Sequence, residues 1–226
     1  MLLFVVLGFF ALVGLVVQGK LRGKFQKYSR VALQTGLNGN EVARNMLQHY
    51  GVLDVQIVQG QGFLTDHYNP ATKTVTLSPA VYQGRNVAAA SVAAHECGHA
   101  VQHATQYSLL QFRSMMVPVV KVAAFAQQYL FLLALFLLGS VPQLMLVVII
   151  AFAVTTLFSV VTLPVEFDAS RRALVWLDNS GVTRTSTEYD GAKDSLKWAA
   201  LTYVVAALSA LAMLVYLVLS YLGSRN

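Results

Sequence analysis

The stretch VAAFAQQYLFLLALFLLGSVPQLMLVVIIAFAVTTLFSVVTL, residues 122–163, contains no Asp, Glu, Lys or Arg. It is roughly twice as long as one membrane span, and only Gly139-Ser140-Val141-Pro142 interrupts it. Because Gly and Pro mark turns, we predict a helical hairpin in which two spans are joined by a tight turn. A hairpin returns the chain to the side from which it entered, so residues 19–120 and 164–197 are expected on the same side of the membrane.

Two shorter apolar runs, near the two ends of the sequence, are each long enough to cross a membrane once. The first run precedes a cluster of Lys and Arg, whereas a secretory signal carries its positive charge before the apolar run. We therefore predict an uncleaved anchor with its N-terminus outside, and about four transmembrane helices in all. The expected segments are the anchor at 1–18, a polar region at 19–120, the hairpin at 121–163, a second polar segment at 164–197, and a last span with its tail at 198–226.

The composition excludes an ordinary soluble domain and a disordered chain. The 226 residues are 56% hydrophobic and 12% charged, whereas a soluble domain carries roughly 25% charged residues. The net charge is +6, but the basic residues follow the span ends, as they do on the cytoplasmic side of membrane proteins. With the N-terminus outside, every Lys and Arg except Arg225 falls on that side or at the inner end of a span. We therefore expect the lipid bilayer as a partner and no nucleic acid, and the oligomeric state stays open.

The first polar region is expected to fold as a small α+β domain. Asn38 and Glu41 have the spacing of a helix capping box. Residues 55–58 and 74–77 are rich in β-branched side chains, which predicts one antiparallel pair of strands. The Ala-rich stretch 86–105 favours a helix. The predicted fold is an α-helical membrane protein with a small cytoplasmic α+β domain that carries a short β-sheet.

The Ala-rich helix contains His95-Glu96-Cys97-Gly98-His99, an H-E-x-x-H sequence. Residues four apart lie on one helix face about 6 Å apart along the axis, so both imidazoles can reach one Zn²⁺. Glu96 borders the same site and is the candidate general base. A catalytic zinc needs three protein ligands and an open position for water, whose pKa the metal lowers toward about 7. The motif therefore predicts one zinc ion per chain and a third ligand from elsewhere.

Three residues are candidates for the third ligand. His103 continues the four-residue spacing, but residues eight apart are about 12 Å apart on a straight helix, too far to share one ion with both other histidines. Glu166 is the stronger candidate, because the hairpin returns it to the side of the histidine helix, and we expect Pro164 to begin its helix. Two alternatives stay open: Glu166 is only a first-turn glutamate favoured by the helix dipole, or Asp168 is the ligand.

Three stretches in order carry a resemblance to a known family. HECGHAVQH at 95–103, LTDHYNPATKTVTLSP at 64–79 and LPVEFDASRRAL at 163–174 resemble the bacterial membrane-bound neutral zinc metallopeptidases of the YugP type. The chain is more distantly similar to membrane gluzincins of the HtpX and CAAX-protease kind. The resemblance implies a gluzincin-like zinc-peptidase domain and a multi-pass protein of the bacterial cytoplasmic (inner or plasma) membrane.

Individual residues carry over from that resemblance. It implies His95, His99 and Glu166 as zinc ligands and Glu96 as general base. Ser170 stands where the distant relatives carry an Asp. The carboxylate that would orient a zinc-bound histidine is therefore missing at that position.

Four further side chains are weaker candidates. Asp168 is an alternative source of the orienting carboxylate, and His103 is expected at the surface, in packing or in support of the site. Asp66 and His67 lie in the link before the second strand, where they contact substrate or metal or form a polar turn. The strand at 74–77 is expected at a sheet edge, where an extended substrate can pair with its backbone.

These patterns favour one function over two others. We expect a membrane-anchored, zinc-dependent endopeptidase that hydrolyses peptide bonds of a protein or peptide substrate at the cytoplasmic membrane surface through a zinc-activated water. The alternative is a zinc-stabilised membrane scaffold or inactive protease homologue that binds peptides or partner proteins. An intramembrane protease is disfavoured, because residues 86–105 are too polar for a lipid-exposed span.

Overall fold

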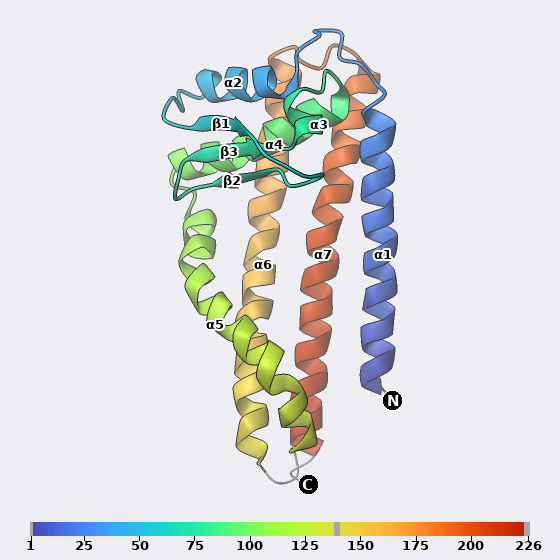
Figure 1. The fold of residues 1–226 in the computed structure, drawn as a ribbon, viewed down its shortest axis with the longest axis vertical. Coiled ribbons are helices and arrows are strands. Elements are labelled where there is room, and N and C mark those ends of the chain that lie inside the picture. Colours follow the sequence, from blue (N-terminus) through green and yellow to red (C-terminus); the bar gives the residue numbers. More distant parts are fainter. Residues whose placement is uncertain (1, 138–140, 224–226) are drawn as a thin grey trace. The chain divides into compact units, whose positions relative to one another are not determined.

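The computed structural model describes residues 2–137 and 141–223. Among these residues, four helices are long and apolar enough to cross a membrane, as the apolar runs predicted (Figure 1). Gly139 and Ser140 of the predicted turn, and Arg225 of the tail, lie outside the described residues. The four long helices are α1 (Leu2–Tyr28), α5 (Ser108–Phe136), α6 (Pro142–Asn179) and α7 (Ser186–Gly223).

Helix α6 corrects one expectation. Pro164 was expected to begin a helix, but it lies inside α6, which continues to Asn179. A proline removes one backbone donor from a helix, and long membrane helices tolerate this loss where neighbouring groups satisfy the freed carbonyl. Glu166 is therefore a residue of the helix interior, and the alternative of a first-turn glutamate is wrong.

The chain divides into two compact units. The first comprises Met1–Val16, Gln111–Pro164 and Thr202–Asn226, and the second comprises Val17–Leu110 and Val165–Leu201. In the first unit, the Gln127 amide donates a hydrogen bond to the Thr155 hydroxyl at 2.6 Å. Polar side chains in an apolar bundle are stabilised by such partners. The second unit contains the sheet, the short helices and the H-E-x-x-H sequence.

Helix α2 (Gly39–His49) begins with the predicted capping box. The Asn38 side chain accepts a hydrogen bond from the Glu41 amide at 2.8 Å, and the Glu41 carboxylate accepts one from the Asn38 amide at 2.7 Å. Val42 and Met46 of this helix are fully buried in the core of the second unit. Local capping and one apolar face thus explain where α2 begins and how it packs.

The sheet has three strands, β1 (Gln56–Gln59), β2 (His67–Asn69) and β3 (Thr74–Leu77), in the order β1-β3-β2. β1 and β3 are parallel, and β2 pairs antiparallel with β3. The prediction of one antiparallel pair was therefore wrong. The long link between the predicted strands returns the chain across the sheet and supplies β2 on the way. β3 is consequently the central strand, and the prediction that it forms a sheet edge was also wrong.

Helix α4 (Val87–Ala104) begins after Asn86, whose side chain accepts a hydrogen bond from the Ala89 amide at 3.0 Å. It contacts α2, the short helix α3 (Pro79–Tyr82), β2 and β3, and Figure 1 shows the sheet and α2 gathered around it. Nearly all of its side chains are buried. Many of them are alanines, which allow other elements to approach the helix closely.

One glycine of α4 determines how closely this helix approaches α6. A Cβ atom at Gly98 would lie 2.7 Å from the Ala169 carbonyl oxygen and 3.1 Å from the Ala169 Cα. Both distances are shorter than nearly all real Cβ contacts. Since the obstructing atoms belong to the backbone, a larger residue at 98 would force the two helices apart.

We expect Gly98→Ala to lower the free energy of unfolding by about 1–3 kcal/mol, because overpacking displaces backbone. Thermal unfolding of the detergent-purified chain measures this change. Gly23→Ala is the matched control: Gly23 is also helical, but a Cβ there meets nothing within 4 Å. The control should be neutral or more stable by up to about 1 kcal/mol, since Ala favours helix. Equal midpoints for the two variants would contradict the close approach.

Candidate metal centre

Three buried side chains of the second unit converge on one point. His95 and His99 come from α4 and Glu166 comes from α6. The Glu166 Oε2 atom lies 3.3 Å from His95 Nε2 and 3.5 Å from His99 Nε2. One donor atom from each residue lies within 4.8 Å of the other two. The structure therefore brings together the three residues predicted as metal ligands.

The donor set and its distances fit a zinc ion. Zinc binds imidazole nitrogen and carboxylate oxygen at about 2.0–2.2 Å, so two ligands of a tetrahedral ion lie about 3.3–3.6 Å apart. The two measured distances to Glu166 match this edge. Two histidines and one glutamate are also a donor set of catalytic zinc sites that keep the fourth position open. The arrangement could hold one metal ion.

Both histidines present Nε2 to the centre and use Nδ1 for support. The Ser170 hydroxyl contacts His95 Nδ1 at 3.1 Å, and the Gln102 Oε1 atom contacts His99 Nδ1 at 3.0 Å. Such contacts orient metal-binding imidazoles and raise their basicity. Ser170 thus supports His95 with a hydroxyl.

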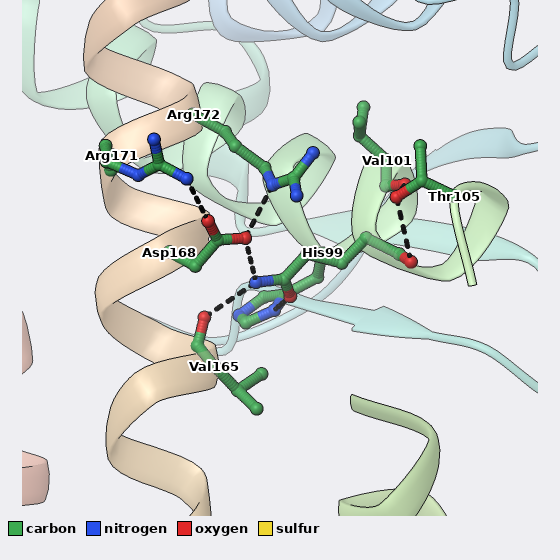
Figure 2. Close-up of polar contacts among 8 residues, drawn as sticks. His99, Val101, Thr105, Val165, Asp168, Arg171 and Arg172 are labelled. Atoms are coloured by element: carbon green, nitrogen blue, oxygen red, sulfur yellow. Dashed lines mark hydrogen bonds and ion pairs between the residues drawn. The ribbon is translucent and has the colours of Figure 1, made fainter. Parts of the chain in front are cut away.

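Asp168 belongs to the support of the site and lies outside the cluster of three donors. Figure 2 shows its carboxylate between the side chains of Arg171 and Arg172 on α6. Arg171 donates to it at 2.6 Å and Arg172 at 2.5 Å. Its Oδ2 atom also accepts a hydrogen bond from Gln102 Nε2 at 2.9 Å. Asp168 therefore reaches His99 only through the Gln102 amide.

Sequence reasoning did not single out Gln102. The residue is fully buried, and it lies three positions after His99, on the neighbouring part of the same helix face. A long polar side chain at that spacing, in a helix whose residues outside the H-E-x-x-H sequence are mostly small or apolar, was the available signal.

Glu96 is buried beside the two histidines. Burial raises the pKa of its carboxyl above the ordinary value, and the nearby His95 and His99 oppose this effect. A carboxylate with a raised pKa accepts a proton more readily near neutral pH, as a general base requires. The environment of Glu96 therefore suits proton transfer.

The other predicted site residues are not among the three clustered donors in the described part of the chain. Asp66 accepts hydrogen bonds from the Ser78 amide at 2.7 Å and the Ser78 hydroxyl at 3.0 Å, which ties the link between β1 and β2 to the start of α3. His67 is an exposed residue of β2, whose Nδ1 contacts the Thr65 carbonyl. His103 Nδ1 contacts the Tyr68 hydroxyl at 2.8 Å.

Comparison with known proteins agrees with this geometry. A family model described as "Putative neutral zinc metallopeptidase" matches residues 3–222, so the chain belongs to this family of zinc peptidases. It is also 42% identical over 209 residues to "Putative membrane protease YugP" of Bacillus subtilis (strain 168), which covers 92% of each chain. No solved structure matches. Together with the four apolar helices, these matches identify a multi-pass membrane protein of a zinc protease family.

We expect zinc retention to fall on acidification. Burial by itself lowers the pKa of His99, but the hydrogen bond and charge of Glu166 outweigh burial, so the net pKa lies above the ordinary value of 6.5. Protons compete with zinc for Nε2, so the apparent affinity should fall about tenfold per pH unit for each imidazole that protonates. Chelator competition between about pH 5 and pH 8 measures this dependence.

His103→Gln is the control for the pH experiment, because His103 lies outside the three donors. Its zinc retention should follow the wild-type pH curve. A wild-type affinity that does not change with pH would contradict a site built on two imidazoles.

Proposed function

We propose that the protein is a zinc-dependent endopeptidase that cleaves protein or peptide substrates at the cytoplasmic surface of the bacterial membrane. The observation that carries the proposal is the convergence of His95, His99 and Glu166 at distances that fit zinc. These three side chains would hold one zinc ion per chain, and the buried Glu96 lies beside them. The family to which the chain belongs supports the same chemistry.

The side chains around the centre have different roles in the proposed hydrolysis. A zinc ion, when bound, supplies a Lewis acid that polarises the scissile carbonyl and acidifies water. Glu96 accepts the proton of the attacking water and passes it to the nitrogen of the leaving amine. Ser170 and Gln102 keep the two imidazoles in place through their Nδ1 contacts. In this way the chain contributes ligands, a base and fixed orientation.

The position of Glu166 along its helix supports action close to the membrane. The uncharged run that began at Val122 ends at Leu163, and Glu166 follows three residues later in the same helix, about 4.5 Å farther along the axis. Substrates would therefore be cleaved near the level where lipid gives way to water. The N-terminus is proposed outside and the site on the cytoplasmic side, because nearly all Lys and Arg would then lie inside.

A zinc-stabilised scaffold without catalysis is the second candidate. A structural zinc site normally has four protein ligands and no base. Here three donors group together within the described residues, and Glu96 is present beside them. Both features favour an enzyme.

We expect about one zinc per chain in the detergent-purified wild type and in Glu96→Gln, because neither loses a ligand. Proteolysis of a quenched-fluorescent peptide library should fall about 10²–10⁴-fold in Glu96→Gln, since a positioned base contributes that much. Zinc content by mass spectrometry and cleavage rates measure the two effects. Glu166→Ala should lose zinc and activity together.

The outcomes of this experiment separate the two candidates. A wild type that binds zinc but shares the activity of Glu96→Gln would favour the scaffold. A wild type without zinc, or a Glu166→Ala variant that retains it fully, would contradict the proposed centre.

We expect a reporter inserted at residues 180–185, between α6 and α7, to lie in the cytoplasm, and a reporter before residue 1 to lie outside. The physical reason is the clustering of Lys and Arg at the inner ends of the spans. Paired reporters, one active only in the cytoplasm and one only outside, measure the orientation. The opposite pattern would place the site on the outer surface.

A further inference from the structure

Gln102 is a buried polar side chain that joins α4 to α6 beside the candidate metal centre. It is 0% exposed and makes three hydrogen bonds. Its Nε2 atom contacts the Val165 carbonyl at 2.8 Å and Asp168 Oδ2 at 2.9 Å, and its Oε1 atom contacts His99 Nδ1 at 3.0 Å. Figure 2 shows Val165 and Asp168 on the α6 side of this network.

The partners on α6 determine which way the Gln102 amide points. The Val165 carbonyl can only accept a hydrogen bond, and the Asp168 carboxylate, which already accepts from two arginines, is also an acceptor. A flipped amide would place its oxygen against both acceptors at about 2.8–2.9 Å. The NH₂ group must therefore face α6, and the amide oxygen must face His99.

The orientation of the amide in turn determines the tautomer of His99. An amide oxygen only accepts, so His99 Nδ1 has to carry a proton to make this contact. In the neutral ring the lone pair then lies on Nε2, 3.5 Å from Glu166 Oε2. We propose that Gln102 is a positioning residue that fixes His99 in the Nδ1–H tautomer and thereby keeps Nε2 available for the metal; this inference rests on the proposed zinc centre.

The contact to His95 Nδ1 does not select a tautomer, whereas the contact of Gln102 to His99 Nδ1 does. Ser170 contacts His95 Nδ1 through a hydroxyl, which both donates and accepts and therefore fits either tautomer. Gln102 fits one tautomer only. Asp168, held by Arg171 and Arg172, is the anchor that keeps the amide from rotating.

Two variants separate tautomer control from simple space filling. Gln102→Met keeps the volume but removes the acceptor for Nδ1–H. The Gln102→Glu, Asp168→Asn double variant exchanges amide and carboxylate, so an acceptor for Nδ1–H and a donor from position 168 are kept. Both lose the hydrogen bond to the Val165 carbonyl, and the double variant also sets a carboxylate oxygen against that carbonyl, a cost that Met does not carry. Ser91→Ala, which removes a buried hydrogen bond to Val87 one turn before His95, is the control.

Zinc affinity by chelator competition is the readout, with helix content and thermal midpoint measured in parallel. We expect Gln102→Met to bind zinc about 10–100-fold more weakly, and the double variant and Ser91→Ala to stay within a few-fold of wild type. If Gln102 only fills space, the double variant should bind zinc more weakly than Gln102→Met, because Met keeps the volume and buries no charge. Wild-type affinity in Gln102→Met, or a folded double variant as weak as Gln102→Met, would overturn the inference.

One further measurement uses the wild type alone and therefore does not depend on the folding of any variant. In zinc-loaded chain labelled with ¹⁵N-histidine, nitrogen shifts should show a proton on Nδ1 of His99 and the metal on Nε2. A proton on Nε2, or the metal on Nδ1, would overturn the role of Gln102 while leaving the zinc centre intact. A wild type that binds no zinc would overturn the proposed function itself, and this inference with it.

Discussion

The close approach of α4 and α6 at Gly98 and Ala169 is the constraint on which the rest of the structure depends. The absence of a side chain at Gly98 allows the Ala169 backbone to lie where a Cβ atom would otherwise stand. His99 follows Gly98 directly, and Glu166 lies about one turn before Ala169. The packing of one glycine thus brings the histidines of one helix to the glutamate of another, and two distant parts of the sequence form one centre.

Burying these charged and polar groups is costly unless each has a partner. The second unit meets this requirement with a chain of contacts: Arg171 and Arg172 hold Asp168, Asp168 holds Gln102, and Gln102 contacts His99. Because most of these partners lie on α6, the helix that provides Glu166 also orients the histidine of the facing helix. The position and the orientation of the candidate metal ligands therefore depend on the same helix contact.

Local signals in the sequence predicted local structure well. The capping box at Asn38 and Glu41 and the helix after Asn86 are confirmed, because side-chain to backbone bonds within four residues determine them. The sheet was predicted less well: β2 was missed, and the pairing of β1 with β3 is parallel. A three-residue strand carries too little pattern to be recognised, and strand order depends on the path of the chain between strands.

The sequence by itself determined the membrane class, the four apolar helices and the two histidines, because length, hydropathy and helical spacing are properties of contiguous residues. It also proposed Glu166, through the return of the chain by a hairpin. Only the tertiary structure decided that Pro164 lies inside a helix, that Asp168 contacts Gln102, and that Ser170 contacts His95. The last two features depend on distances between side chains more than sixty positions apart, which no local pattern encodes.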